Sequence, residues 1–547
     1  MDALFIAINA KYIHTNNAVR LLKANSLFDI DILDFTIKDS IDTIYTSIKE
    51  LNPSIVGFST YIWNVDMVTN LTKLIKESTN IKVVLGGPEV SYDPLYFLDT
   101  TKADVVVKGE GEHIINDILT SLKLNSSLKT INNVSTYENN EFINNPIKEI
   151  ADLSSLNSPY YFTEDIPHIK NKIAYIETSR GCPYKCSYCL SSLEKKVRFF
   201  DIETVKRDIL YLLKNGAKTF KFLDRTFNAS KHIIPILDFI IKNHIEGTVF
   251  QFEITGDVLN PKVIDYIHSH APKGLFRFEI GIQSTNEETN LLVDRFQNNE
   301  ILFSNINKIQ DQDVIDLHLD LIAGLPKEDL ISFKNTFNTV YLLGAKELQL
   351  GFLKMLRGTK IRNQAALYGY LYDNDAPYEI KSNDVLSARD KEIIKQVEKT
   401  LNIFHNKGFF NDLLFEIIKE HFSPFDFFYQ LYIYMKTNNV PFVRYQIDQI
   451  YHVLSRFLQN EGINESVLIQ LKITYLLRAK VKPKCYFDLV LDKEAKAYCF
   501  EKLLNTYGIP IDKLYKHTVL FEDESTYHCA YYQKQTAHYY AVKKGCH

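Results

Sequence analysis

Short apolar runs alternate with amphipathic stretches over the first 125 residues. Strands that alternate with helical patterns are typical of βαβ units around a parallel sheet. The stretch 65–77 has helical spacing between two such runs. The segment 126–170 is rich in Asn, Ser and Pro and lacks this periodicity, so it predicts a linker with at most a small hairpin. The predicted strands are 4–8, 55–59, 83–85 and 104–107.

A second alternating series begins at Ile173. Helical stretches at 202–215 and 232–242 separate its apolar runs. About six β/α repeats fit a barrel or part of one, with catalytic residues at the carboxyl ends of the strands. The predicted strands are 174–178, 219–223, 249–254, 275–282, 317–321 and 348–353.

The texture changes from about residue 366. Helical spacing at 386–404, 440–458 and 467–479 predicts a mainly helical third domain. The aromatic stretch 422–434 is interpreted as core, with a substrate-facing wall as the alternative. The predicted organisation is a first domain over 1–140, a linker over 141–168, a second domain over 169–365 and a third over 366–547.

Composition narrows the class of protein. The chain has 547 residues, too many for one core, with 46% apolar and 24% charged residues, as in ordinary globular proteins. The net charge of −4 gives no basic excess, so nucleic-acid binding is not expected. Apolar runs fall short of the ~18 residues of a membrane span, and the N-terminus lacks the features of a signal peptide. We therefore expect a cytoplasmic protein without a membrane partner.

Three of the seven cysteines fall within eight residues, as C-x3-C-x2-C directly after the first predicted barrel strand. Three thiolates on one loop can wrap one face of a metal centre. A four-iron cluster normally takes four Cys ligands, so three leave one iron open to chelate a small substrate. A structural zinc site would need a fourth ligand, and no His between His168 and His232 supplies one. The three cysteines are Cys182, Cys186 and Cys189; Cys485, Cys499, Cys529 and Cys546 are scattered near the C-terminus.

This motif, with the aromatic Tyr188 before its last Cys, resembles the signature of the radical S-adenosylmethionine (SAM) superfamily. The resemblance implies a 4Fe-4S cluster whose open iron binds SAM. It also implies an external one-electron reductant of the flavodoxin or ferredoxin type, and cleavage of SAM to a 5′-deoxyadenosyl radical. The superfamily's Gly-Gly-Glu after the second strand is absent, and Asp224 and Arg225 stand there. The SAM-binding candidates are Tyr188, Asp224, Glu253, Glu279, Gln283 and Gly324, each with a polar cap at the barrel rim as the alternative.

Three Gly-containing loops follow predicted strands of the first domain, at 57–64, 86–89 and 108–112. There is no G-x-G-x-x-G, so a dinucleotide fold is not indicated. Ahead of such a barrel, these loops resemble the cobalamin-binding domain of cobalamin-dependent radical SAM proteins. The resemblance implies a flavodoxin/Rossmann-like sheet with the corrin between it and the barrel; a degenerate domain without ligand is the alternative. The cobalamin candidates are Ser59, Thr60, Tyr61, Asn64, Gly86, Gly87, Pro88, Gly109, Glu110, Gly111, Glu112 and His14.

His14 stands where cobalamin domains carry the His of D-x-H-x-x-G, but the Asp and the Gly are replaced by Tyr12 and Asn17. A ligating His normally needs a carboxylate or carbonyl partner to fix its tautomer. We therefore expect His14 to contact the nucleotide tail or to cap the following helix, and not to ligate cobalt.

The fold class predicted from these patterns is α/β: a flavodoxin/Rossmann-like parallel-sheet domain, a partial (β/α)6 radical SAM barrel and a mainly helical C-terminal domain. The last resembles the C-terminal domain of an uncharacterised branch of these proteins. The function implied is a cobalamin-dependent radical SAM C-methyltransferase that acts at an unactivated carbon. Its substrate is a small molecule or a peptide, and no catalytic residue is assigned.

Three alternatives differ in chemistry. A cyclase or a rearrangement enzyme would use the same cofactors without methyl transfer. A non-catalytic cobalamin or SAM sensor would have no use for a reducible cluster. A methylthiotransferase needs a second cluster near the N-terminus, and residues 1–181 contain no Cys.

Overall fold

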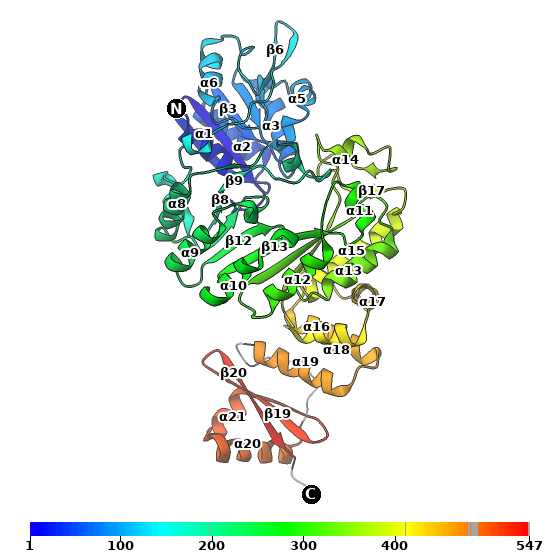
Figure 1. Ribbon diagram of the computed structural model, residues 1–547. Helices are drawn as coiled ribbons and strands as arrows, with labels where there is room; N and C mark the ends of the chain where they lie inside the picture. The colour runs from blue at the N-terminus through cyan, green and yellow to red at the C-terminus, as the bar shows by residue number, and fades with distance from the viewer. Residues whose placement is uncertain (195, 411, 480–481, 483–490, 545–547) are drawn as a thin grey trace. The chain divides into compact units, whose positions relative to one another are not determined.

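The computed structural model describes residues 1–547 except 195, 411, 480–481, 483–490 and 545–547 (Figure 1). Cys485 and Cys546 lie outside the described residues. The chain forms two compact units, and each is described by itself. The first contains Met1–Thr336 and Gln349–Lys391, and the second contains Phe337–Leu348 and Glu392–His547.

The N-terminal domain is a seven-stranded sheet with the order β2-β1-β3-β4-β5-β6-β7. Its first five strands pair in parallel, and the hairpin β6–β7 adds an antiparallel edge. All seven residues of β1 are buried, as expected for a strand covered on both faces. The strands are β1 (Ala3–Asn9), β2 (Ile30–Thr36), β3 (Ile55–Ser59), β4 (Lys82–Gly86), β5 (Val105–Val107), β6 (Val134–Glu138) and β7 (Glu141–Asn144).

Two apolar clusters cover the two faces of this sheet. One contains residues of α2, α3 and α5, and the other contains residues of α1 and α6. The sheet is therefore a three-layer α/β domain whose loops after β1, β3, β4 and β5 gather at one edge, as the parallel strand directions require. The helices are α1 (Asn17–Ala24), α2 (Ile41–Leu51), α3 (Val65–Ser78), α4 (Pro88–Ser91), α5 (Pro94–Thr101) and α6 (Ile115–Leu124).

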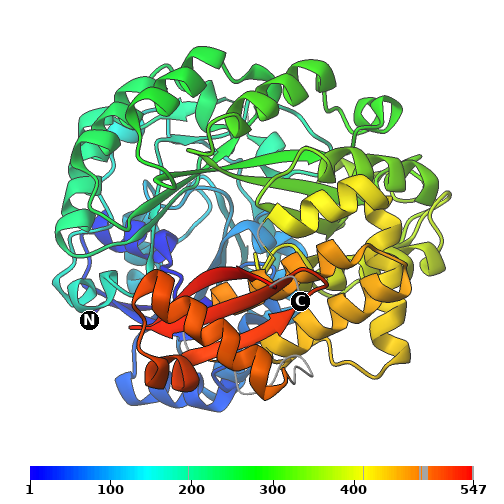
Figure 2. The ribbon, with the colours of Figure 1, turned by 90° about the horizontal axis from the view of Figure 1, so that it is seen from below.

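The second sheet has six strands in the order β15-β14-β13-β12-β11-β8, and the pairings from β8 to β14 are parallel. Its outward face carries Phe220, Phe222, Phe250, Phe252 and Phe276, all at most 1% exposed. Figure 2 shows the green helices outside the green strands along the curve of this sheet. The strands are β8 (Ile173–Ile176), β11 (Thr219–Phe222), β12 (Val249–Ile254), β13 (Phe276–Gln283), β14 (Asp316–Ala323) and β15 (Glu347–Phe352); the helices that follow are α8 (Ile202–Lys214), α9 (Ile233–Asn243), α10 (Pro261–His270), α12 (Asn299–Gln310) and α13 (Leu330–Tyr341).

The predicted flavodoxin/Rossmann-like sheet and the partial barrel are confirmed. One strand of the first sheet, β2, was not predicted. It is an edge strand whose residues after Ile30 are half-buried or exposed, so its apolar signal is weak. β6 and β7 form a small hairpin within the segment 126–170, and this hairpin joins the sheet beside β5 and extends it past residue 140.

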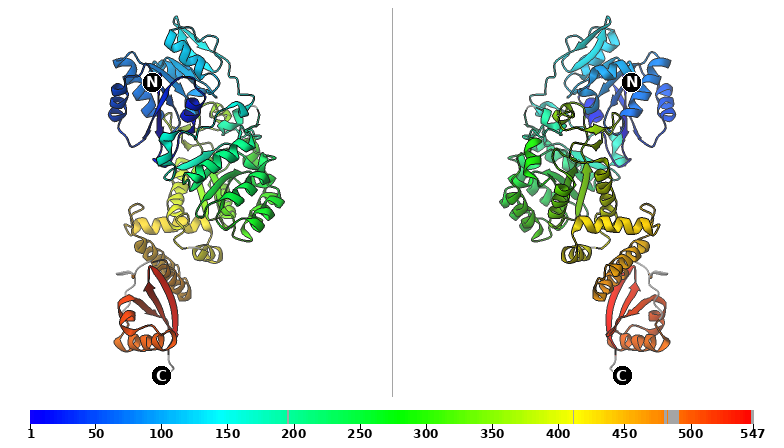
Figure 3. Two further views of the ribbon diagram at one scale, coloured as in Figure 1. Left: turned by 90° about the vertical axis from the view of Figure 1, so that its left-hand side faces the viewer. Right: turned by 90° about the vertical axis from the view of Figure 1, so that its right-hand side faces the viewer.

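The second unit is mainly helical, as predicted. The aromatic stretch 422–434 lies on α17, where Phe425, Phe427 and Phe428 are fully buried, which confirms its interpretation as core. A three-stranded antiparallel sheet at the C-terminal end was not predicted, and Figure 3 shows its red strands beside orange-red helices. The elements are α15 (Ala388–Phe404, which begins in the first unit), α16 (Asp412–His421), α17 (Pro424–Thr437), α18 (Ile447–Asn460), α19 (Glu465–Arg478), α20 (Lys493–Tyr507), α21 (Ile511–His517), β18 (Thr518–Glu522), β19 (Thr526–Gln533) and β20 (Thr536–Lys543).

A search of the described residues for a helix long and apolar enough to cross a membrane found none.

The stacked phenylalanines predict a large stability loss on truncation. Phe252 lies 4.4 Å from Phe222 and 4.3 Å from Phe227 between ring centroids. Phe252→Ala should lower the free energy of unfolding by about 3–5 kcal/mol, because it leaves a cavity among rigid rings. Phe296→Ala, at a side chain that is 72% exposed, should change it by less than about 0.5 kcal/mol. Urea denaturation measures both, and equal losses would contradict the packing described.

Candidate functional site

A cavity of about 870 Å³ lies between the loop edge of the first sheet and the first strands of the barrel. The barrel side of its wall includes Tyr175, Glu177, Arg180, Gly181 and Arg225. From the cysteine loop (residues 179–191) the wall contains Ser179, Arg180, Gly181, Leu190 and Ser191. Cys182, Cys186 and Cys189 lie between these residues in the sequence and are not part of the wall. The cavity therefore reaches from the predicted cobalamin loops to the two ends of the cysteine loop. The predicted cobalamin residues in its wall are His14, Ser59, Tyr61, Gly86, Gly87, Pro88, Gly109, Glu110, Gly111 and Glu112.

Thr60 and Asn64 are fully buried behind this wall. The amide of Asn64 donates to the carbonyls of Ile8 (2.9 Å) and Ser59 (3.0 Å), and its oxygen accepts from the backbone N–H of Tyr61 (2.7 Å). These contacts favour a role for Asn64 as a support of the loop after β3 over the predicted ligand contact. Thr60 does not line the cavity, and its hydroxyl oxygen has no hydrogen-bond partner.

Trp63 also lies in the cavity wall, although it is not among the cobalamin-binding residues predicted from the sequence. Its ring stacks on Tyr61 with 4.4 Å between centroids, and its Nε1 donates to the carbonyl of Ile8. Burial raises the pKa of Tyr61 to about 12, so this hydroxyl stays neutral. The pair gives the cavity a flat aromatic surface, of a shape suited to a planar ligand.

The loop after β4 approaches the loop after β3 very closely. Gly87 has φ +108°, and a Cβ there would lie 2.4 Å from the carbonyl oxygen of Thr60. Only Gly fits this approach. The next acidic residue, Glu89, is buried and accepts a hydrogen bond of 2.7 Å from the hydroxyl of Tyr378.

His14 lies in the cavity wall with its Nδ1 2.6 Å from the hydroxyl of Tyr175 on β8. Burial, with Lys11 and Lys221 nearby, lowers the pKa of His14, which favours the neutral imidazole. The expectation that His14 caps the following helix is wrong: Asn16 is the cap of α1, and its side chain accepts from the N–H of Val19.

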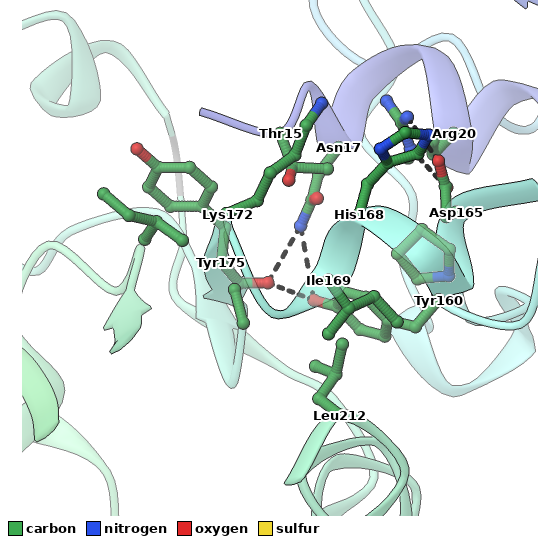
Figure 4. Close-up of a pocket in the computed structure, with 13 residues that line it drawn as sticks. Thr15, Asn17, Arg20, Tyr160, Asp165, His168, Ile169, Lys172, Tyr175 and Leu212 are labelled. Atoms are coloured by element: carbon green, nitrogen blue, oxygen red, sulfur yellow. Dashed lines mark hydrogen bonds and ion pairs between the residues drawn. The ribbon is translucent and has the colours of Figure 1, made fainter. Parts of the chain in front are cut away.

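Buried polar contacts hold α1 against β8 beside a small cavity of about 40 Å³ (Figure 4). The amide of Asn17 donates to the carbonyl of Tyr175 (2.9 Å). Arg20 forks between Asp34 (2.7 Å) and Asp165 (2.6 Å) with 4% of its side chain exposed. The contact of Asn17 fixes the strand that presents Tyr175 to His14, and Arg20 ties α1 to β2 and to the connector at Asp165.

The cysteine loop leaves β8 through β9 (Ser179–Arg180). Cys182 and Cys189 are half-buried and Cys186 is buried. The backbone of Ser187 bonds to Val293 and Ile361, which ties the middle of the loop to two later segments. Three thiols on one loop, with no other Cys in the first unit, are a donor set that fits an iron–sulfur cluster with one open iron.

Arg295 is a further residue at this loop that the sequence did not indicate. Its Nη1 lies 3.4 Å from the hydroxyl of Tyr188 and 4.0 Å from the sulfur of Cys186. It places a fixed positive charge beside thiolates that would otherwise repel one another.

Asp224 is hydrogen-bonded to the residues that lead from β8 into the cysteine loop. Its two oxygens accept from the N–H and hydroxyl of Thr178 and from the hydroxyl of Ser179, at 2.5–3.0 Å. Burial raises its pKa to about 6, although these three donors oppose the shift. The carboxylate is fully committed to the protein, which favours a positioning role over the predicted direct contact with SAM.

The other barrel candidates divide into two groups. Glu253 faces Arg225 (3.6 Å) and Glu279 faces Lys221 (3.0 Å) on the inner side of the sheet. Burial raises the pKa of Glu253; the ion pair with Lys221 outweighs burial and lowers that of Glu279. Gly324, by contrast, is buried, and its carbonyl accepts from the hydroxyl of Tyr370.

β13 ends at the half-buried Gln283, which has a left-handed backbone conformation, and the buried Ser284 follows it. Gln283 has φ +68°, and its side-chain oxygen has no hydrogen-bond partner. Ser284 donates to Glu328 at 2.6 Å, and Thr336 donates to the same carboxyl oxygen at 3.0 Å. Glu328 is fully buried, and burial raises its pKa to about 7.

Comparison with known families agrees with this arrangement. The B12 binding domain model matches residues 4–119, the radical SAM superfamily model matches 176–340, and a model for a protein of unknown function, DUF4080, matches 366–518. The chain thus combines a B12 binding domain with a radical SAM domain and carries the DUF4080 domain at its C-terminal end. The cofactors that go with these matched domains are cobalamin, a 4Fe-4S cluster and SAM.

Relatives cover different parts of the chain. An uncharacterised methyltransferase of Pyrococcus horikoshii is 32% identical over 37% of this chain and 46% of its own. The cobalamin-dependent radical SAM methyltransferase TokK of Streptomyces tokunonensis is 26% identical over 54% of this chain and 46% of its own. The chain thus spans about half the length of these curated relatives. The structure of OxsB with aqua-cobalamin and SAM bound covers 93% of this chain and 82% of its own, with a TM-score of 0.63 and 15% identity, which shows a shared fold.

The cysteine loop predicts the iron content. Anaerobic reconstitution should give about four iron and four sulfide per chain. Replacing Cys182, Cys186 or Cys189 by Ala should abolish this content. Cys499→Ala and Cys529→Ala are matched controls, because both thiols are fully buried in the apolar core of the second unit. Equal loss of iron from a control would contradict the three-ligand site; Cys485→Ala and Cys546→Ala should also retain iron.

Glu328 predicts a pH dependence of stability. Its folded pKa of about 7 lies above the ordinary 4.5, so its stabilising contribution is complete below pH 4.5 and is lost as the pH rises through 7. Glu328→Gln keeps an oxygen for Ser284 and removes the charge. Relative to this variant, the wild type should lose about 1–3 kcal/mol between pH 4.5 and 7.5 in urea titrations. Glu288→Gln, at an exposed residue of α11 (Glu287–Leu292), should track the wild type; parallel curves for wild type and Glu328→Gln would refute the assignment.

Proposed function

We propose that the chain is a cobalamin-dependent radical SAM methyltransferase that acts at an unactivated carbon. The observation that carries the proposal is the single cavity whose wall contains the cobalamin loops and the two ends of the cysteine loop. When bound, the cluster and SAM supply a 5′-deoxyadenosyl radical, and cobalamin supplies the methyl group. Relatives named as methyltransferases support this choice over other cobalamin-dependent reactions.

The charge of the cavity wall suits these ligands. The wall contains six glutamates and four Lys or Arg residues, which leaves two negative charges with His14 neutral. A buried negative excess favours a cationic ligand group such as the sulfonium of SAM. The glutamates are Glu89, Glu110, Glu112, Glu149, Glu177 and Glu194, and the bases are Lys148, Arg180, Arg198 and Arg225.

The chain's own residues hold and seclude the reacting groups. Asp224 fixes the backbone that leads into the cysteine loop, and Tyr175 fixes the ring of His14. Arg225 and Glu253 place opposite charges at the barrel mouth, where the amino and carboxylate groups of SAM need partners. Exclusion of water protects a radical from side reactions.

The proposal includes partners that the family requires. Radical SAM proteins need an external one-electron donor, and we propose one of the flavodoxin or ferredoxin type in the cytoplasm. The substrate is a small molecule or a peptide.

The direct test is product mass. Protein purified anaerobically with cobalamin, supplied with SAM carrying a deuterated methyl group and a low-potential reductant, should transfer labelled methyl to a component of a cellular extract. The Cys186→Ala variant should transfer none. Cleavage of SAM with a mass-neutral product would favour a cyclase or rearrangement enzyme. An intact cluster that never cleaves SAM would favour a sensor.

The contact of His14 predicts the axial ligation of cobalt. The hydroxyl of Tyr175 engages Nδ1, and Tyr12 supplies no carboxylate, so the ring lacks the partner that ligating histidines use. The cobalt(II) form should show no nitrogen superhyperfine splitting in electron paramagnetic resonance, and His14→Ala should leave the signal unchanged. Splitting in the wild type that the variant loses would show that His14 is a ligand.

A further inference from the structure

A buried arginine connects the cobalamin loop after β5 to the cysteine loop. Nη1 of Arg180 lies 3.0 Å from Oε1 of Glu110, and Nη2 lies 2.8 Å from Oε1 of Glu112. The side chains of Arg180 and Glu112 are 12% and 8% exposed. The same guanidinium also pairs with Glu177, through Nη2 at 3.0 Å and Nε at 3.2 Å. A guanidinium that forks between carboxylates of two loops at this burial fixes both their distance and their direction.

Arg180 also belongs to the cysteine loop itself. It is two residues before Cys182 and pairs in β9 with Arg198 of β10 (Arg198–Phe199). Gly181, which stands between Arg180 and Cys182, has φ +91°, and a Cβ there would lie 2.4 Å from the carbonyl oxygen of Lys196. The backbone from Arg180 to Cys182 is therefore held in one conformation. A displacement of Arg180 consequently also displaces Cys182.

The carboxylate of Glu110 completes the connection. One oxygen accepts from Arg180, and the other lies 2.7 Å from Nη1 of Arg198 and accepts from the backbone N–H of Ile150. The predicted ligand carboxylates Glu110 and Glu112 thus point at arginines of the barrel. In the 109–112 loop, the backbone and the two glycines are therefore the groups left to contact a ligand.

We propose that Arg180 is a positioning residue that couples the two cofactor sites, so that a corrinoid bound against residues 109–112 tightens the binding of SAM at the cysteine loop. The inference rests on the shared cavity of the proposed function. When the corrinoid orders the 109–112 loop, the ion pairs of Arg180 should order the cysteine loop as well. The two loops stay joined because breaking these ion pairs would leave buried charges unpaired. Linkage requires the effect to be reciprocal: SAM tightens corrinoid binding by the same factor.

The test measures binding and not turnover. In the full-length protein with its cluster reconstituted and oxidised, the SAM dissociation constant is determined by calorimetry with and without saturating hydroxocobalamin. The wild type should bind SAM at least about fivefold more tightly with hydroxocobalamin present. In Arg180→Lys the factor should fall below about twofold, because an ammonium keeps the charge but cannot fork between two carboxylates. Iron content should stay unchanged.

Arg20→Lys is the matched control. Arg20 is another buried arginine that forks between two carboxylates, Asp34 and Asp165, and neither of them belongs to the cysteine loop. This variant should retain the wild-type factor even if it is less stable. Should Arg180→Lys fail to fold, the double variant Arg180→Gln/Glu112→Gln replaces Arg180 and its most buried partner by neutral groups, while Glu110 keeps its ion pair with Arg198. This variant should also lose the factor.

Hydrogen exchange provides an independent readout. Hydroxocobalamin should slow exchange of the amides at 178–189 in the wild type and in Arg20→Lys, and should leave them unchanged in Arg180→Lys. A wild type that binds both ligands without coupling, or an Arg180→Lys protein with the full factor, would overturn the inference. Coupling without methyl transfer would refute the proposed function and leave this inference standing.

Discussion

Buried arginine forks hold the cobalamin-binding sheet against the radical SAM barrel, and the cavity between them depends on these contacts. Arg20 joins α1 to the connector at Asp165, and Arg180 joins the 109–112 loop to the cysteine loop. Arg357 donates to Asp93 and to the hydroxyl of Tyr378, which in turn donates to Glu89. A buried fork cannot lose one carboxylate without leaving a charge unpaired. Two sheets with separate cores thereby enclose one cavity of defined size.

These ion pairs and hydrogen bonds also explain why several acidic residues at the site serve the protein structure and not a ligand. Glu110, Glu112 and Asp224 sit where a ligand-binding role would be expected, yet each is engaged by protein donors. The cavity wall also contains glycine backbone, the Tyr61–Trp63 stack and His14. These groups make few directional demands on a large planar ligand, while the ion pairs of Glu110 and Glu112 with Arg180 hold the 109–112 loop beside the cysteine loop.

Much of the architecture could be predicted from local sequence. The barrel strands alternate a fully buried phenylalanine face with a polar inner face, so period two is strong at 219–222 and 249–254. The cysteine motif was predictable because its three cysteines fall within eight residues of the sequence. β2 and the sheet β18–β20 were missed, because their half-exposed or polar, tyrosine-rich residues carry no clear apolar period. The bond between His14 and Tyr175 joins residues 161 positions apart, and the fork of Arg180 spans 68 and 70 positions, so one sequence gives no signal for either.

The central claim is that cobalamin and the cluster occupy the two sides of one cavity. The measurement that tests it most directly is electron paramagnetic resonance of the full-length protein with both centres paramagnetic, as cobalt(II) and as the reduced cluster. The account predicts that the reduced cluster broadens the cobalt signal and speeds its relaxation, and that the effect disappears when the cluster is oxidised. A cobalt signal with the same width and relaxation in both states would place the two centres apart and contradict the account.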